Sequence, residues 1–165
     1  MDEAVVRTAR EADVPAILDI YNWAILNTTA TFDIEPQTLE EKMAWFRETT
    51  HPYAVLVAAR GDEVLGWASL RPFRAKAAYR FTVENSVYVH QDCLGQGIGT
   101  LLMRHLMEVA AASGFHSIIA GIASPNPASV RLHERFGFVL AGVEREVGYK
   151  FERWIDVAWM QKMLA

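Results

Sequence analysis

The pattern of hydrophobic and polar residues predicts strands and helices that follow one another in a mixed order. Runs rich in β-branched and aromatic residues predict strands over residues 4–8, 53–60, 63–70, 81–89, 117–122, 139–146 and 155–163. Apolar residues at helical spacing predict helices over residues 12–25, 38–48, 98–113 and 125–135. This order predicts a mixed α/β (α+β) fold, with helices on both faces of a sheet.

Local signals support several of these boundaries. Pro15 suits the first turn of the first helix. Thr38 and Glu41 have the spacing of a capping box, which opens the second helix. Gly114 suits the end of the third helix, and Ser124 or Asn126 the start of the fourth.

One stretch, residues 86–103, contains the clearest candidate binding site. The strand around Tyr88 leads into three glycines at alternate positions, Gly95, Gly97 and Gly99, and a helix follows. Glycines permit close backbone approach, and the first N–H groups of a helix have no internal acceptor, so this order predicts an anion site. The spacing fits neither the Rossmann G-x-G-x-x-G pattern nor a Walker loop. A glycine-rich turn without a ligand is the alternative.

Composition limits the possible classes of protein. The chain has 165 residues, of which 52% are hydrophobic and 22% charged, as expected for one globular domain over residues 1–165. Its net charge of −4 argues against a nucleic-acid partner. No apolar run is long enough for a bilayer, and no signal peptide is visible, so a cytoplasmic location without membrane association is expected. Cys93 is the one cysteine, which suits a reducing compartment and is interpreted as incidental. The five histidines lack metal-ligand spacing, and no metal is expected.

Two motifs resemble those of the GNAT superfamily of acetyl-CoA-dependent N-acetyltransferases. The segment Leu94-Gly95-Gln96-Gly97-Ile98-Gly99 is similar to the pyrophosphate loop Arg/Gln-x-x-Gly-x-Gly/Ala, with Leu94 departing from the usual Arg or Gln. Residues 126–138 are similar to the second motif, Asn-x-x-(Ala/Ser)-x-x-Leu-(Tyr/His)-x-x-x-Gly-(Phe/Tyr). The resemblance implies the GNAT fold, a central twisted mixed sheet of six to seven strands, and acetyl-CoA as co-substrate.

Further segments resemble one branch of the superfamily, the phosphinothricin and methionine sulfoximine acetyltransferases. They are residues 31–38, 73–89, 129–134 and 148–157, so the resemblance extends over roughly residues 5–163. It implies direct acetyl transfer to the α-amine of phosphinothricin, methionine sulfoximine, methionine sulfone or a similar small amino acid. It also implies a homodimer with a shared groove at the active site. Trp154 and Trp159 are expected in the core or in that interface.

Glu84 is the candidate base for this chemistry. An amine must lose a proton to attack a thioester, and a carboxylate can accept it directly or through water. Glu84 lies in a strand otherwise suited to burial, where desolvation would raise its pKa. Strand alternation also permits an outward-facing Glu84 without a function. The family places a base at this position.

The leaving thiolate and the oxyanion need donors. Tyr88 or His133 could protonate the thiolate, and a backbone N–H near Tyr88 or Val89 could stabilise the oxyanion. For His133 the alternative is a surface histidine bonded to Glu134 or to solvent. The resemblance assigns the coenzyme to Val87, Tyr88, Val89, Leu94, Gly95, Gln96, Gly97, Ile98, Gly99, Thr100, Asn126 and Ser129.

A basic segment precedes the predicted catalytic strand and suits an acceptor that carries a carboxylate. It contains Arg71, Arg74, Lys76 and Arg80 without an intervening acid, although a solvated basic loop is the common explanation. The resemblance places Arg74 and Lys76 at the branch's two cationic positions. It also assigns the acceptor to Phe32 as an apolar wall, to Tyr79 and to Glu84.

Two other functions are considered. An N-acetyltransferase for a polyamine, an aminoglycoside or a protein N-terminus is the nearer rival, but a polycationic acceptor would need an acidic pocket rather than this basic loop. A non-catalytic acetyl-CoA-binding regulator would keep the glycine loop and lose the base, whereas this chain has a candidate base.

Overall fold

The computed structural model describes residues 3–164, which form one seven-stranded sheet in the order β1-β2-β3-β4-β5-β7-β6. Its strands are β1 Val5–Thr8, β2 Ala54–Arg60, β3 Glu63–Pro72, β4 Thr82–Val89, β5 Ser117–Ser124, β6 Val139–Lys150 and β7 Arg153–Met163. Only β4 and β5 pair in parallel, and the other neighbours are antiparallel. The predicted mixed sheet of six to seven strands is therefore confirmed.

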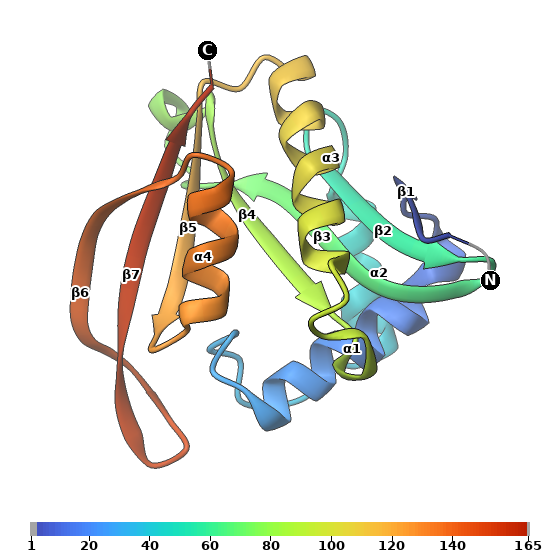
Figure 1. Cartoon of the computed structure of the whole chain (residues 1–165), viewed down its shortest axis with the longest axis horizontal. Helices are drawn as coiled ribbons and strands as arrows, with labels where there is room; N and C mark the ends of the chain where they lie inside the picture. Colours follow the sequence, from blue (N-terminus) through green and yellow to red (C-terminus); the bar gives the residue numbers. More distant parts are fainter. Residues whose placement is uncertain (1–2, 165) are drawn as a thin grey trace.

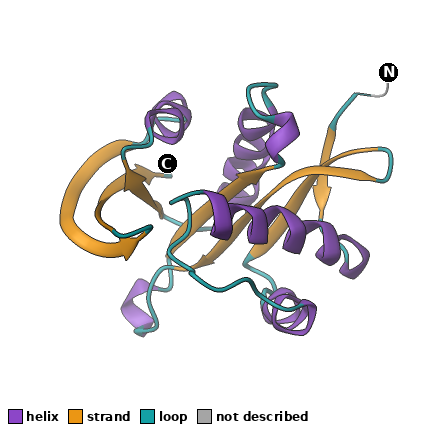
Figure 2. Cartoon of the chain, turned by 90° about the horizontal axis from the view of Figure 1, so that it is seen from below, coloured by secondary structure: helices purple, strands orange, loops and turns teal. Residues whose placement is uncertain are grey.

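Four α-helices cover the two faces of this sheet (Figure 2). They are α1 Val14–Asn27, α2 Leu39–Glu48, α3 Ile98–Ala112 and α4 Pro127–Arg135, with short 3-10 helices at Glu11–Asp13, Ala77–Tyr79 and Gln91–Cys93. Helices α3 and α4 lie in front of the sheet in the view of Figure 1, and α1 and α2 lie behind it. The prediction of helices on both faces is confirmed.

Strand alternation divides the buried side chains between the two faces. On β2, Leu56 and Ala58 join a cluster with α3, while Val55 and Val57 join a cluster with α1. On β4, Val87 packs into the α3 cluster and Tyr88 into the α1 cluster. The β2–β3 hairpin reads as continuously apolar because both of its faces are covered by helices.

The parallel pair at the centre separates along its length. Strands β4 and β5 pair over Thr82–Glu84 and Ser117–Ile119, after which β5 continues against β7 alone. Figure 1 shows the two strands diverging towards the N-terminal ends of α3 and α4. A wedge therefore opens inside the sheet, between two strands that both continue.

Most helix boundaries agree with the sequence signals. Thr38 Oγ1 accepts from the Glu41 N–H, and a Glu41 carboxylate oxygen accepts from the Thr38 N–H, which confirms the capping box. Helix α4 begins two residues later than expected, after the Asn126 cap. Strand β6 runs to Lys150 rather than residue 146, because the β6–β7 turn falls at residues 151–152, with an irregularity between Glu144 and Gly148.

Candidate active site

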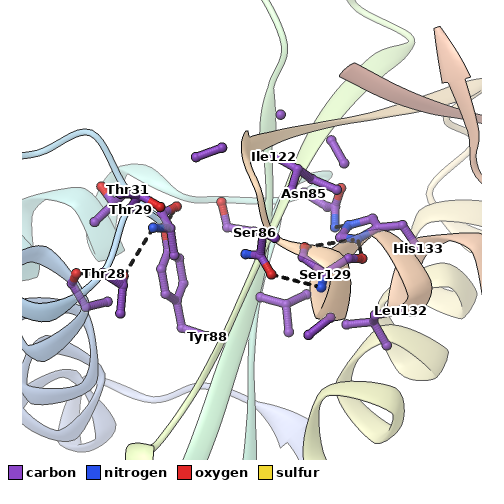
Figure 3. Close-up of a pocket in the computed structure, with 18 of the residues that line it drawn as sticks. Thr28, Thr29, Thr31, Asn85, Ser86, Tyr88, Ile122, Ser129, Leu132 and His133 are labelled. Atoms are coloured by element: carbon purple, nitrogen blue, oxygen red, sulfur yellow. Dashed lines mark hydrogen bonds between the residues drawn. The ribbon is translucent and has the colours of Figure 1, made fainter. Parts of the chain in front are cut away.

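A cavity of about 750 Å³ occupies the wedge between β4 and β5 (Figure 3). Its walls come from residues 84–89 of β4, residues 120–123 of β5, residues 28–32 after α1, and one side of α4. Residues far apart in the sequence meet here because the strands separate. The cavity is large enough for the reactive end of an extended ligand and a small second substrate.

The glycine loop lies beside this cavity. Gly95 and Gly97 have φ angles of +73° and +83°, which side chains rarely adopt, and a Cβ at either would meet open space. Gly97 caps α3 and its carbonyl accepts from Leu101, so the N–H groups of residues 98–100 have no acceptor within the helix. The loop thus presents free amides and open space to a ligand, as an anion site requires.

The edge of β4 that faces the wedge carries further main-chain N–H groups that can donate to a ligand. The His90 N–H donates to the Leu65 carbonyl of β3 at 2.9 Å. N–H groups alternate along an antiparallel strand, so those of Asn85, Val87 and Val89 point to the opposite edge. Among the described residues, β5 pairs with that edge only as far as Glu84. The Val89 N–H can therefore stabilise an oxyanion, whereas the Tyr88 N–H points to β3, which corrects that part of the sequence prediction.

Glu84 lines the cavity at the point where the strands separate. Burial raises the pKa of its carboxyl, and the positive charge of Arg74 partly opposes that rise. The carboxylate is half-buried, and within residues 3–164 it forms no hydrogen bond or ion pair. Such a group can accept a proton from a molecule in the cavity.

Tyr88 forms the wall opposite α4 (Figure 3). Its ring stacks on Trp67 with centroids 4.8 Å apart, and its hydroxyl donates to the Ala30 carbonyl at 3.2 Å. The Tyr21 ring packs edge-on against the Tyr88 ring, with the ring centroids 5.3 Å apart. Burial raises the pKa of the Tyr88 hydroxyl above its usual value, and the electrostatic effect of Tyr21 raises it further. Tyr88 therefore keeps its proton at neutral pH.

His133 is buried, with 4% of its surface exposed, and both of its ring nitrogens have partners. Nδ1 lies 2.7 Å from the Ser129 carbonyl, which fixes it as the donor. Nε2 then accepts from the Asn85 amide at 3.0 Å. Burial lowers the pKa of His133, so the ring is neutral. The surface-histidine alternative is wrong, since the partners of the ring are Ser129 and Asn85.

Comparisons with known proteins agree with this geometry. The acetyltransferase (GNAT) domain matches residues 6–159. This chain belongs to the GNAT family. A phosphinothricin N-acetyltransferase from Streptomyces coelicolor is 46% identical, covering 98% of this chain and 97% of its own. An L-methionine sulfoximine/L-methionine sulfone acetyltransferase from Pseudomonas paraeruginosa is 45% identical, covering 96% and 93%.

A solved GNAT structure carries the coenzyme. It is a phosphinothricin acetyltransferase from Sinorhizobium meliloti in complex with acetyl-CoA, with a TM-score of 0.95 and 37% identity, covering 98% of this chain and 89% of its own. Fold and family are therefore shared with proteins whose names state N-acetylation of small amino-acid analogues.

The GNAT cavity brings together many, but not all, of the predicted residues. Its lining includes Phe32, Glu84, Val87, Tyr88, Val89, Leu94, Gly99, Asn126, Ser129 and His133. The neighbouring loop and first turn of α3 hold Gly95, Gln96, Gly97, Ile98 and Thr100. The lining does not include Arg74, Lys76 or Tyr79, although Arg74 is near enough to act on the charge of Glu84.

Several lining residues were not predicted. Asn85 was missed because it alternates away from Glu84, yet it is a polar residue, 6% exposed, in an apolar strand, which is a usable signal. Tyr21 falls in the apolar pattern of the helix predicted over residues 12–25, but its hydroxyl lies 2.8 Å from Thr31 Oγ1 and 2.6 Å from an Asp33 oxygen. Trp159 lines the cavity and contacts Gly121, whereas Trp154 is 63% exposed.

Two absences hold for the part of the chain that the structure describes. Residues 3–164 contain no group of three or more His, Cys, Asp or Glu side chains placed to hold a metal. No helix within that range is long and apolar enough to cross a membrane.

Proposed function

We propose that this GNAT protein transfers an acetyl group from acetyl-CoA to the α-amine of a small amino acid or analogue, of the phosphinothricin or methionine sulfoximine type. The observation that carries the proposal is the half-buried, unpaired carboxylate of Glu84 at the end of a wedge flanked by an amide-rich glycine loop. The close relatives named for these substrates support it.

The residues beside the cavity fit an acyl-CoA co-substrate. The free amides of residues 98–100 and the open space at Gly95 and Gly97 suit the diphosphate. The main-chain edge of Val87 and Val89 suits the amide-bearing pantetheine arm, which can pair with it like a strand. Leu94 is 59% exposed and offers no polar group, so the diphosphate would depend on main-chain donors here.

Transfer takes place in a ternary complex, without an acyl-enzyme. Glu84 accepts the proton of the acceptor ammonium, directly or through water, and the freed nitrogen attacks the thioester carbonyl carbon. A free N–H on this edge of β4 stabilises the oxyanion. The carbon–sulfur bond then breaks, and the nitrogen loses its second proton to solvent as the amide forms. Cys93 is the one thiol of the chain; it is buried, 8% exposed, and outside the cavity lining, so it is not the nucleophile.

Tyr88 is the better candidate to protonate the leaving thiolate. Its hydroxyl keeps a proton at neutral pH and reaches the cavity. His133 is the poorer donor, because both of its ring nitrogens are held by partners at 2.7 and 3.0 Å, whereas the Tyr88 O–H has only the longer contact of 3.2 Å with the Ala30 carbonyl. In this proposal His133 and Asn85 instead shape the wall contributed by α4.

The acceptor lies between Glu84 and the basic segment. Arg74 acts electrostatically on Glu84, so a carboxylate held by Arg74 and Lys76 would place the α-amine near the base. Phe32 supplies an apolar wall, and its ring packs so closely on Gly148 that a Cβ at this position would clash with it. Tyr79 contacts Phe73 edge-on at 5.6 Å and would complete this side.

A homodimer is part of the same proposal. The exposed apolar side chains of the β6–β7 hairpin support it; they include Val139, Leu140, Val143, Val147, Tyr149, Phe151, Trp154 and Met163. Sedimentation as a monomer at micromolar concentration would contradict it. We further propose a single catalytic domain, as one continuous sheet supports, and a cytoplasmic location, as one unpaired cysteine supports.

Thiol release from acetyl-CoA tests the function. The assay compares phosphinothricin, methionine sulfoximine, methionine sulfone and ordinary amino acids with spermidine, an aminoglycoside and an N-terminal peptide. Turnover restricted to the amino-acid group is expected. Preference for a polycation or peptide would overturn the acceptor, and binding of acetyl-CoA without turnover of any amine would favour a regulator.

A further inference from the structure

A second cavity lies on the α1–α2 face of the sheet, behind the wall that Tyr88 forms. Its volume is about 280 Å³, and it shares Tyr21, Ser86 and Tyr88 with the main cavity. The rest of its lining comes from α2, from β3 and from residues 33 and 37. Acetyl transfer as proposed above uses none of the charged groups in this second cavity.

The dominant charge in this cavity is a buried lysine. Lys42 is only 2% exposed, and its Nζ lies 3.9 Å, 4.1 Å and 4.9 Å from the ring centroids of Tyr21, Trp45 and Trp67. Within residues 3–164, no hydrogen bond or ion pair joins this ammonium to an acceptor. Burial lowers the pKa of Lys42 to about 8, with Asp33 opposing and Arg71 adding to the effect. Ring faces attract a cation but accept its N–H groups poorly.

Two more donors face the same space. Arg71 lines the cavity, and one of its nitrogens, Nη1, donates to Thr49 Oγ1 and to the Trp45 carbonyl. The indole N–H of Trp67 is buried and has no acceptor among the described residues. The indole N–H of Trp67 is therefore free to donate to a ligand, and so are the N–H groups of Lys42.

Acceptors are fewer. The Asp33 carboxylate at the rim already accepts from the Tyr21 hydroxyl at 2.6 Å and from the Gln37 side chain at 3.2 Å. The remaining orphan acceptor is Gln37 Oε1, which one water molecule can satisfy. Two partly desolvated cations that repel each other, beside an unpaired indole N–H, leave an excess of donors and of positive charge that an anion would satisfy.

We infer that this second cavity is a binding site for a small monoanion, of halide or carboxylate size, held by Lys42, Arg71 and the Trp67 N–H. The volume accommodates such an ion with a few waters, since a water occupies about 30 Å³. The anion neutralises the Lys42 ammonium, which lies among the rings of Tyr21, Trp45 and Trp67. It thereby stabilises the stack of Trp67 on Tyr88, which is the wall of the main cavity.

Bromide diffraction locates the ion directly. Crystals of the intact protein grown in sodium bromide are expected to give an anomalous peak in contact with Lys42 Nζ and near Trp67 Nε1. Crystals of Lys42→Met are expected to lack it. Wild-type crystals without bromide in this cavity would overturn the inference, whatever the enzymatic activity of the protein.

Thermal unfolding tests the site in solution and distinguishes a halide from a carboxylate as the bound anion. Sodium chloride or sodium acetate replaces sodium gluconate, a bulkier salt, at constant ionic strength. Wild type is expected to gain about 3–5 °C for each tenfold increase above the dissociation constant. Lys42→Met should lose this dependence, while Lys162→Met, on β7 outside the cavity, should keep it. A response to acetate alone assigns a carboxylate and a response to both a general monoanion site, whereas equal responses in Lys42→Met and wild type would refute it.

Discussion

Replacing Glu84 with Gln separates catalysis from stability. The two side chains have nearly the same volume, and the Glu84 carboxylate forms no hydrogen bond or ion pair within the described residues, so the substitution breaks neither. The ability to accept a proton disappears, together with the negative charge and its attraction to Arg74. General bases contribute about 10²–10⁴-fold, so kcat/KM at neutral pH should fall by that factor, or about 2.7–5.4 kcal/mol in transition-state free energy.

The pH profile gives the sign of the effect. The pKa of Glu84 is raised by burial, and a base must be ionised, so wild-type kcat/KM should fall as pH decreases through that raised value. The ionised form is also penalised in the folded state, so wild type loses some stability as pH rises from 4.5 through the folded pKa. Gln removes this penalty, and the Tm of Glu84→Gln at pH 7 should equal or exceed that of wild type.

Steady-state thiol release and thermal unfolding measure the two quantities on the same samples. Glu144→Gln is the matched control, because Glu144 also lines the cavity but is exposed. Its activity should remain within a few-fold of wild type. Near-normal kcat/KM for Glu84→Gln at neutral pH would refute the assignment, and a large loss confined to Glu144→Gln would transfer the role to that carboxylate.

Three other substitutions test separate parts of the site and fold. Tyr88→Phe should lower kcat by roughly 10²–10⁴-fold with a smaller change in the KM for acetyl-CoA, because a general acid contributes only at the transition state. An unchanged kcat would show that Tyr88 is not the general acid. Gly97→Ala places a side chain at a φ of +83° and should lower the unfolding free energy by about 1 kcal/mol. It should also weaken acetyl-CoA binding measured by calorimetry, and an unaltered affinity would argue against this loop as the coenzyme-binding site. Asp13→Asn should cost about 1–3 kcal/mol in urea unfolding, because the carboxylate accepts from Arg7 at 2.7 and 2.8 Å. The hydrogen bonds with Arg7 lower the pKa of the Asp13 carboxyl from its ordinary value of 3.8. Their contribution to folding stability is therefore present above pH 3.8 and is lost as the pH falls through the lowered pKa. A destabilisation by Asp13→Asn that persists at pH 2 would contradict this origin.

Local patterns predicted most of the fold and the glycine loop that lies beside the cavity. The glycines at 95–99 and the Thr38–Glu41 box act over a few residues, so the chain encodes them locally. The spacing of apolar residues likewise predicted helices whose ends differ by only a few positions. Val87 and Tyr88 pack on opposite faces of the sheet, as the alternation of side chains along the predicted strand requires.

Contacts between distant segments could not be predicted in this way. Nothing near residue 133 indicates that His133 meets Asn85, because the contact depends on how far β5 diverges from β4. Lys42 follows two glutamates on a helix, a pattern typical of an exposed face, yet Trp67 and Tyr21 enclose it. The extent of β6 beyond residue 146 depends on pairing with β7, which tolerates Glu146 at a φ of +51°.

The central claim is that the coenzyme diphosphate lies on the free main-chain amides of residues 94–100. A crystal structure of this protein with acetyl-CoA tests it most directly. We expect phosphate oxygens within hydrogen-bond distance of those amides, and the thioester carbonyl beside the free edge of β4, on the way from Val89 towards Glu84. A coenzyme bound at another surface, with the wedge between β4 and β5 empty, would contradict it.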